Sequence, residues 1–126
     1  MKLRSIELFA GAGGLALGTA RAGFKHLVVV ERDAHSCATL RANNPDWPVE
    51  QTDSRKFDFT AFRDRVELLT AGAPCQPFSL GGKHAGHEDE RDMFPEVARV
   101  VRETRPEVVI VENVKGLLRE GFREYF

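Results

Sequence analysis

The stretch LVVVERDAHSCATLRAN, residues 27–43, holds a short apolar strand followed at once by a helix. Its consecutive aliphatic residues are typical of a strand covered on both faces, since a half-buried strand alternates apolar and polar residues. Asp33 stands where a helix N-cap is expected, and the pair Asn44-Pro45 ends the helix. A strand that runs directly into a helix is the building unit of a parallel sheet.

The alternation of strand and helix continues on both sides of this stretch. A second apolar run, VVIV at residues 108–111, is again typical of a strand buried on both faces. The expected strands are Arg4–Phe9, Leu27–Glu31, Val49–Thr52, Val66–Thr70 and Val108–Val111. The expected helices are Gly14–Ala22, Ala34–Asn43 and Met93–Thr104, the last of them blocked by Pro106. The pattern predicts an α/β fold, a mostly parallel sheet with helices on both faces.

The composition is that of one globular domain of nearly neutral charge. Of 126 residues, 42% are hydrophobic, and 18 lysines and arginines stand against 19 aspartates and glutamates, a net charge of −1. No apolar run approaches the roughly 18 residues of a membrane span, and no signal-like stretch follows Met1. Cys37 and Cys75 lack the spacing of a disulfide framework or a zinc ribbon. We expect an intracellular, cytoplasmic protein with no membrane partner, in which local basic clusters make any contact with nucleic acid.

Glycine and acidic residues gather where the expected strands end. The first strand runs into the turn FAGAGG, residues 9–14, and Glu31 and Asp53 stand at the ends of the second and third. The carboxyl ends of parallel strands share one edge of the sheet, where α/β proteins bind their ligands. Glu31 follows Gly11 by 20 residues, the interval at which an acidic side chain meets ribose hydroxyls. A nucleoside cofactor is indicated, although the turn lacks full GxGxxG spacing and could serve strand–helix packing alone.

The segment GAPCQPFS, residues 72–79, places one cysteine between two prolines at the end of the fourth strand. The prolines make the turn rigid, and a thiol becomes a nucleophile where amides or cations stabilise its thiolate. Cys75 is therefore predicted to be a catalytic nucleophile. The alternative is a buried, small apolar residue, which is the interpretation we give to Cys37 inside its helix.

The glycine-rich residues 80–91 predict a polar loop above this edge of the sheet. Their His84, His87 and Asp89 have the spacing of a solvated loop rather than of a metal site, so we expect phosphate contact and no metal. Glu112, at the end of the fifth strand, is expected to be partly desolvated. Burial favours the protonated form of a carboxyl group, which can donate a proton. The alternative is that Glu112 is an ionised carboxylate that caps the next helix.

Taken together, these motifs resemble the N-terminal part of the DNA (cytosine-5) methyltransferase family. The match consists of ELFAGAGG at residues 7–14, PCQ at 74–76 with FS at 78–79, and ENV at 112–114. The resemblance covers nearly the whole chain and implies a Rossmann-like fold that depends on S-adenosylmethionine. Residues 1–126 would then be the N-terminal portion of a single catalytic domain, with the first five strands of an incomplete sheet and no target-recognition region.

The resemblance also implies roles for individual residues, with Glu31 on the ribose hydroxyls and Asp53 on the adenine amino group. The implied cofactor contacts are Phe9, Gly11, Gly13, Gly14, Leu15, Glu31, Asp53 and Pro74. The implied catalytic residues are Cys75 and Glu112, and the candidate DNA contacts are Gln76, Ser79, Lys83 and Arg91. Arg32 stands where the family often carries an aromatic or apolar residue that packs on the adenine.

The implied reaction transfers a methyl group from S-adenosylmethionine to C5 of cytosine in double-stranded DNA. Cys75 adds to C6 of a flipped-out cytosine while protonated Glu112 holds N3. Because later family motifs are absent, we expect activity only when the chain is completed in trans or within a longer chain. The exposed fifth strand predicts a complementing C-terminal chain, self-association or a fragment of a longer protein. One alternative is a catalytically silent cofactor-binding or regulatory fragment. Another is a nicotinamide-dependent oxidoreductase, which would explain the glycine turn and Glu31 but neither PCQ nor ENV.

Overall fold

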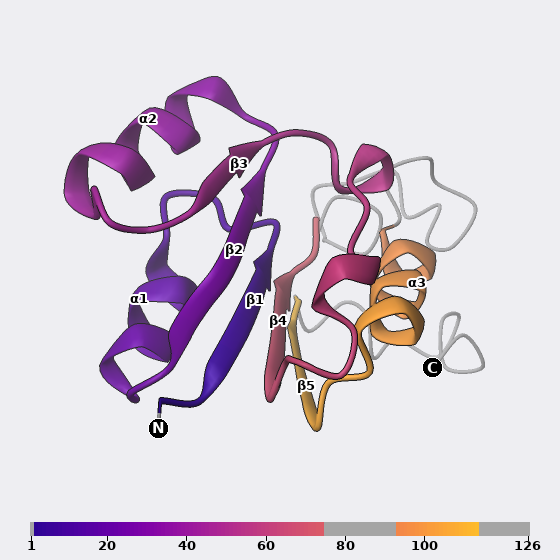
Figure 1. Ribbon diagram of the computed structural model, residues 1–126. Helices are drawn as coiled ribbons and strands as arrows, with labels where there is room; N and C mark the ends of the chain where they lie inside the picture. Colours follow the sequence, from indigo (N-terminus) through magenta and orange to yellow (C-terminus); the bar gives the residue numbers. More distant parts are fainter. Residues whose placement is uncertain (1, 75–92, 114–126) are drawn as a thin grey trace.

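The computed structural model describes residues 2–74 and 93–113 (Figure 1). The strands are β1 (Arg4–Leu8), β2 (Lys25–Glu31), β3 (Val49–Gln51), β4 (Leu68–Gly72) and β5 (Val108–Glu112). The α-helices are α1 (Gly14–Arg21), α2 (Ala34–Asn43) and α3 (Phe94–Thr104), and the 3-10 turns are η1 (Ser54–Lys56) and η2 (Thr60–Phe62). The predicted alternation of strand and helix is confirmed, whereas the two 3-10 turns were not expected.

The sheet is parallel throughout, with the strand order β3-β2-β1-β4-β5. Figure 1 shows α1 and α2 on one side of this sheet and α3 on the other. The chain moves outward from β1 in one direction to β3 and then crosses to β4 on the other side of β1. A ligand of such a sheet binds beyond the strand ends at this reversal. The predicted doubly wound architecture is therefore confirmed.

Of the three described α-helices, α2 alone begins with a side-chain cap. Asp33 caps α2 as predicted, because its side chain accepts a hydrogen bond from Ser36 N at 2.8 Å. Phe9, expected in the first strand, instead leaves it with a φ of 54°, which turns the chain toward the glycine motif. Met93 is the N-cap of α3 rather than its first residue, and α3 ends at Arg105, whose φ is 52°.

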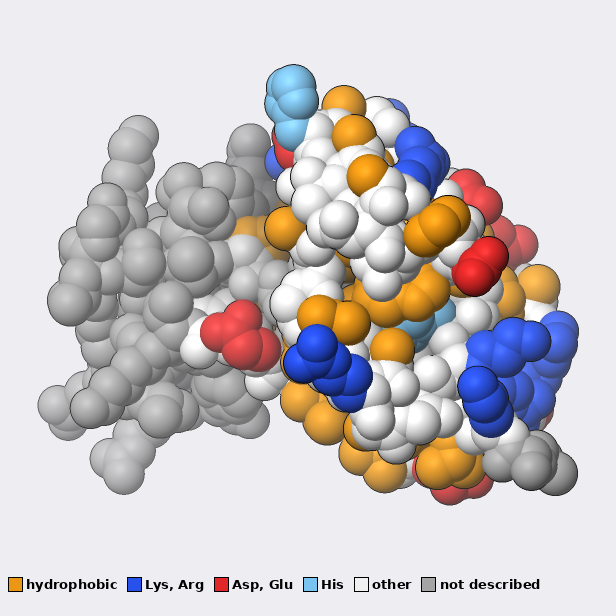
Figure 2. All heavy atoms as spheres, turned by 90° about the vertical axis from the view of Figure 1, so that its left-hand side faces the viewer, with side chains coloured by type: hydrophobic (Ala, Val, Ile, Leu, Met, Phe, Trp, Pro, Cys, Tyr) orange, Lys and Arg blue, Asp and Glu red, His pale blue; other side chains and the backbone are white. Residues whose placement is uncertain are grey.

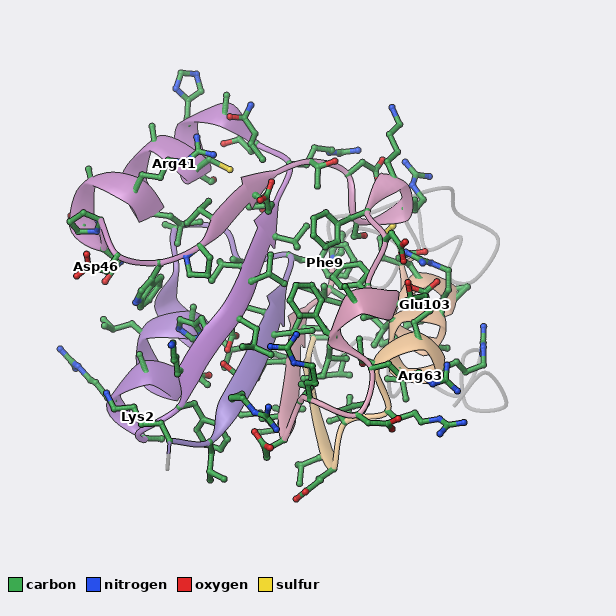
Figure 3. The ribbon with its side chains drawn as sticks, viewed as in Figure 1. Lys2, Phe9, Arg41, Asp46, Arg63 and Glu103 are labelled. Atoms are coloured by element: carbon green, nitrogen blue, oxygen red, sulfur yellow. The ribbon has the colours of Figure 1, made fainter. Side chains whose placement is uncertain are left out.

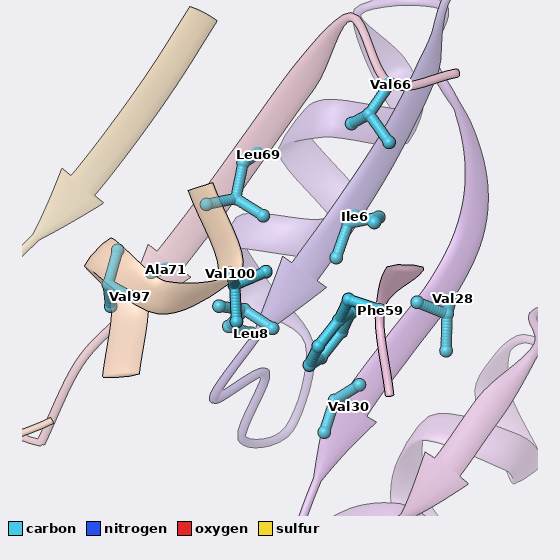
Figure 4. Close-up of a cluster of buried hydrophobic side chains, with 10 residues drawn as sticks. All are labelled: Ile6, Leu8, Val28, Val30, Phe59, Val66, Leu69, Ala71, Val97 and Val100. Atoms are coloured by element: carbon cyan, nitrogen blue, oxygen red, sulfur yellow. The ribbon is translucent and has the colours of Figure 1, made fainter. Parts of the chain in front are cut away.

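One compact hydrophobic cluster lies between the sheet and α3 (Figure 4). Its members come from β1, β2, β4, α3 and the connection between β3 and β4. They are Ile6, Leu8, Val28, Val30, Phe59, Val66, Leu69, Ala71, Val97 and Val100. Phe59 is fully buried and brings the irregular β3–β4 connection into the core. This packing fixes the segment that begins at Asp53, beside the carboxyl edge of the sheet.

The opposite face of the sheet holds a polar cluster that depends on a β-bulge. Ser5 pairs with His26 and Ile6 pairs with Val28, so Leu27 is an extra residue of β2. The bulge brings His26 onto the face of α1, where its Nε2 lies 3.1 Å from the carbonyl oxygen of Ala16. A carbonyl only accepts, so Nε2 carries the hydrogen.

The edge strand β5 is apolar and exposed. Within residues 2–74 and 93–113 it pairs with β4 alone, and its four aliphatic residues are 39–54% exposed. This agrees with the expected apolar edge, whereas the expectation that residues 108–111 form a strand covered on both faces is wrong for the described residues. On the α1 and α2 face, Figure 2 shows lysine and arginine side chains in separate groups among apolar and acidic ones, not in one continuous basic band. None of the described helices is long and apolar enough to cross a membrane.

Candidate active site

The glycine turn after β1 combines close packing with open space. Gly13 has a φ of 99°, and a Cβ there would lie 2.6 Å from Cδ2 of the buried Leu40. Gly11 has a φ of 56°, and no heavy atom lies within 4 Å of a Cβ placed on Gly11 or on Gly14. Gly13 therefore serves packing and conformation, as one of the two interpretations predicted. Gly11 and Gly14 leave room for a ligand to approach the backbone.

Glu31 is fixed in direct contact with this turn. Its Oε1 accepts a hydrogen bond from Gly11 N at 3.2 Å, and its Oε2 accepts from Arg32 N at 2.8 Å and Asp33 N at 3.2 Å. The spacing of 20 residues thus brings the acidic side chain to the glycine turn, as expected. The three backbone groups hold the carboxylate at the end of β2, where its remaining lone pairs can accept from hydroxyl groups.

Asp53 follows β3 and caps η1. Its Oδ1 accepts from Arg55 N at 3.0 Å, and the Arg55 guanidinium contacts both carboxylate oxygens. These hydrogen bonds, with smaller contributions from the nearby charges of Arg55 and Arg32, lower the pKa of Asp53 to about 2. Asp53 is therefore an anionic acceptor next to Glu31, since β2 and β3 are paired neighbours.

The other half of the edge joins the Glu-Asn-Val motif to the segment that leads to Cys75. Asn113 Nδ2 donates to the carbonyl oxygen of Ala73 at 3.2 Å and approaches that of Pro74 at 3.4 Å. A Cβ on Gly72 would lie 3.9 Å from Glu112 Oε2. The end of β5 is thus tied to the end of β4. From the sequence, Asn113 was named only within the Glu-Asn-Val motif and was given no role. Its position directly after Glu112 was the one feature of the sequence that could have indicated this contact.

Two expectations have a definite structural outcome, and two of the proposed cofactor contacts can be placed. Glu112 is exposed, so its expected partial burial is wrong; β5 has only β4 beside it within the part of the chain that the structure describes. Phe9 is half-buried between the end of β1 and the connection that carries η1 and η2 (Figure 3). Cys37 is fully buried, and burial raises the pKa of its thiol, which confirms its structural interpretation. Leu15 is 37% exposed on α1.

The remaining candidates lie outside the described residues. They are Cys75, Gln76, Ser79, Lys83, Arg91 and the possible metal ligands His84, His87 and Asp89. Of the residues that the structure does describe, none form a group of three or more histidine, cysteine, aspartate or glutamate side chains suited to a metal ion. The roles of these candidates remain predictions.

Comparison with known proteins places the chain in a family. Residues 3–126 match the family described as C-5 cytosine-specific DNA methylase. The chain belongs to this family. It is 48% identical over 125 residues to the type II methyltransferase M.NgoMIV of Neisseria gonorrhoeae, covering 99% of this chain and 40% of that protein. It is 54% identical over 113 residues to M.PspPI of a Psychrobacter strain, covering 89% of this chain and 27% of that protein.

Solved structures support the same family fold. A prophage-encoded protein of E. coli, titled a DNA modification methyltransferase, superimposes with a TM-score of 0.78 at 32% identity. The match covers 97% of this chain and 35% of that one. The fold is thus the Rossmann-like methyltransferase fold that the motifs indicated. The chain spans less than half the length of each of these relatives.

Proposed function

We propose that the chain carries the cofactor-binding and nucleophile-bearing part of an enzyme that methylates C5 of cytosine in DNA. The observation that carries this proposal is the contact of Asn113 Nδ2 with the carbonyls of Ala73 and Pro74. It joins the two motifs that contain the proposed catalytic residues, at the edge of the sheet where Glu31 meets the glycine turn. Membership of the methylase family supports the same reaction.

The residues present fit S-adenosylmethionine. The space beside Gly11 and Gly14 accepts a ligand against the backbone, and the Glu31 carboxylate is fixed to accept from ribose hydroxyls. Asp53 is an anionic acceptor for an adenine amino group, and Pro74, Phe9 and Leu15 complete the proposed contacts. Gly13 shapes the turn, and its backbone is a further proposed contact. When bound, S-adenosylmethionine supplies an electrophilic methyl group.

In the proposed reaction, the chain activates a cytosine base that is too weakly nucleophilic to be methylated unaided. The Cys75 thiolate forms a bond to C6, while Glu112 holds a proton at N3, and the ring electrons move toward C5. Loss of the C5 proton after methylation then re-forms the C5–C6 double bond and expels Cys75. Glu112 is exposed in this structure. We propose that the incoming base desolvates it.

The proposed substrate is double-stranded DNA with the target cytosine flipped out, because a stacked base cannot reach such a site. Gln76, Ser79, Lys83 and Arg91 are the proposed DNA contacts, and the proposed location is intracellular, at the nucleoid if the source is prokaryotic. We further propose that methylation requires what the relatives carry outside the matched region. The exposed apolar strand β5 would pair with that part or with a second copy.

The test is covalent trapping on DNA duplexes of varied sequence that contain 5-fluorocytosine, which cannot release the enzyme from C6. The chain is assayed with S-adenosylmethionine, alone and mixed with the remaining part of M.NgoMIV. We expect a denaturation-resistant adduct that Cys75→Ala abolishes and the matched variant Cys37→Ala retains. Cofactor binding without any adduct would instead support a silent or regulatory fragment. Preferential binding of a nicotinamide dinucleotide would support the oxidoreductase.

A further inference from the structure

Arg55 binds the Asp53 carboxylate with its guanidinium and with its backbone N–H. Arg55 Nε lies 3.0 Å from Oδ1 and 3.1 Å from Oδ2, and Nη2 lies 2.6 Å from Oδ2. The Arg55 backbone N–H also donates to Oδ1 at 3.0 Å. One edge of the carboxylate is therefore taken up by Arg55, and further acceptor positions lie on its other side.

This carboxylate is also fixed relative to the rest of the fold. Arg99 of α3 donates from Nη2 to the carbonyl oxygens of Ser54 at 3.0 Å and Phe57 at 3.4 Å. The Arg99 guanidinium is itself held by Glu96, whose two oxygens each lie 3.0 Å from Nε. The segment that carries Asp53 is thus anchored to α3, and within it Arg55 contacts both oxygens of the Asp53 side chain.

We propose that Arg55 is a specificity-determining residue, which orients the Asp53 carboxylate so that the site selects adenine over hypoxanthine. The inference rests on the proposed function, in which Asp53 faces the base. An oriented carboxylate only accepts, so it attracts the exocyclic amino group of adenine and repels the carbonyl oxygen of hypoxanthine. Without the Arg55 guanidinium, the Arg55 backbone N–H still binds Oδ1, but the carboxyl is less fixed and more readily holds a proton, which a carbonyl accepts.

The test measures binding of S-adenosylhomocysteine and S-inosylhomocysteine to the 126-residue chain by calorimetry. Arg55→Met keeps the aliphatic stem and removes the donors, and Arg55→Lys keeps the charge without the planar fork. We expect Arg55→Met to reduce the preference for the adenine ligand about two- to tenfold, the value of one ordinary hydrogen bond. We expect Arg55→Lys to restore part of that preference.

The matched control is Arg4→Met, because Arg4 makes an ion pair of similar geometry with Glu67 at the amino-terminal ends of β1 and β4. Arg4 Nη2 lies 2.6 Å from Glu67 Oε1, and Nε lies 3.1 Å from Oε2. This variant should keep the wild-type preference. A second readout needs no ligand: the carboxyl carbon of Asp53, observed by NMR, should titrate near pH 2 in the wild type and at higher pH in Arg55→Met.

The possible outcomes separate the two proposals. An unchanged preference in Arg55→Met, or tighter binding of the adenine ligand, overturns the role of Arg55 and leaves the proposed function intact. A wild-type chain that binds neither ligand overturns cofactor binding by this chain and, with it, this inference. Equal losses in Arg55→Met and Arg4→Met would show a general effect of losing an ion pair, which also overturns the inference.

Discussion

Replacing Gly13 with alanine should destabilise the fold far more than replacing its neighbour Gly14. The φ of 99° at Gly13 is unfavourable for a residue with a Cβ, which costs about 1–3 kcal/mol. The new methyl carbon would also lie 2.6 Å from Cδ2 of Leu40, a fully buried side chain. Overpacking of this kind costs about 1–3 kcal/mol. We therefore expect Gly13→Ala to lower the free energy of unfolding by about 2–6 kcal/mol, a large part of a typical total.

The neighbouring glycines provide a graded control for this prediction. Gly14 has no positive φ and no heavy atom within 4 Å of a new Cβ, so Gly14→Ala should change stability by less than about 1 kcal/mol. Gly11 has a φ of 56° and open space around it, so Gly11→Ala should lower the free energy of unfolding by about 1–2 kcal/mol. Urea unfolding followed by circular dichroism gives each value, with equal slopes required. Equal stability of Gly13→Ala and Gly14→Ala would refute the reasoning.

Three further predictions concern other contacts. Asn113→Ala loses its hydrogen bonds to the carbonyls at the end of β4, so trapping on 5-fluorocytosine should fall by a larger factor than S-adenosylhomocysteine affinity; an equal loss of both contradicts this. Leu69→Ala in the core should cost about 2–5 kcal/mol in urea unfolding, and a loss below 1 would not fit its full burial. The Arg4 hydrogen bonds lower the pKa of Glu67 from 4.5 to about 2, so this contribution to stability is complete above pH 4.5 and is lost as the pH falls toward 2. Unfolding free energies measured from pH 6 to 2 should fall less steeply in Arg4→Met.

The fold was predictable where a local pattern agreed with the tertiary structure. Helix α2 runs over Ala34–Asn43 as predicted, because Asp33 caps its start and Asn44 with the following proline ends it. The contact of Glu31 with Gly11 was likewise implied by spacing alone, since a strand, turn and helix of standard length bring these residues to adjacent strand ends.

Other features could not be predicted, because they depend on contacts between distant segments. Phe57, Phe59 and Phe62 follow neither the helical nor the strand period, so the 3-10 turns that bury Phe59 gave no periodic signal. The bulge at Leu27 is also invisible in a continuous apolar run. The exposure of Glu112 was misjudged because a run of aliphatic residues was taken as buried, whereas β5 is the edge strand among the described residues.

Glu7 and Glu31 show why membership of a motif does not define a role. Glu7 belongs to the opening motif, yet it is 1% exposed; Thr70 Oγ1 donates to it, and its Oε1 lies 3.4 Å from His26 Nδ1. Among the described residues its hydrogen-bond partner is the Thr70 side chain on β4, while its buried Oε1 has none, so Glu7→Gln should lower stability by disturbing a buried contact. Glu31 accepts from backbone groups, including Gly11 N, at the open edge. Glu31→Gln should therefore reduce S-adenosylhomocysteine affinity with little change in urea unfolding. Calorimetry and unfolding on both variants test the distinction, and a loss of affinity without a loss of stability in Glu7→Gln would contradict it.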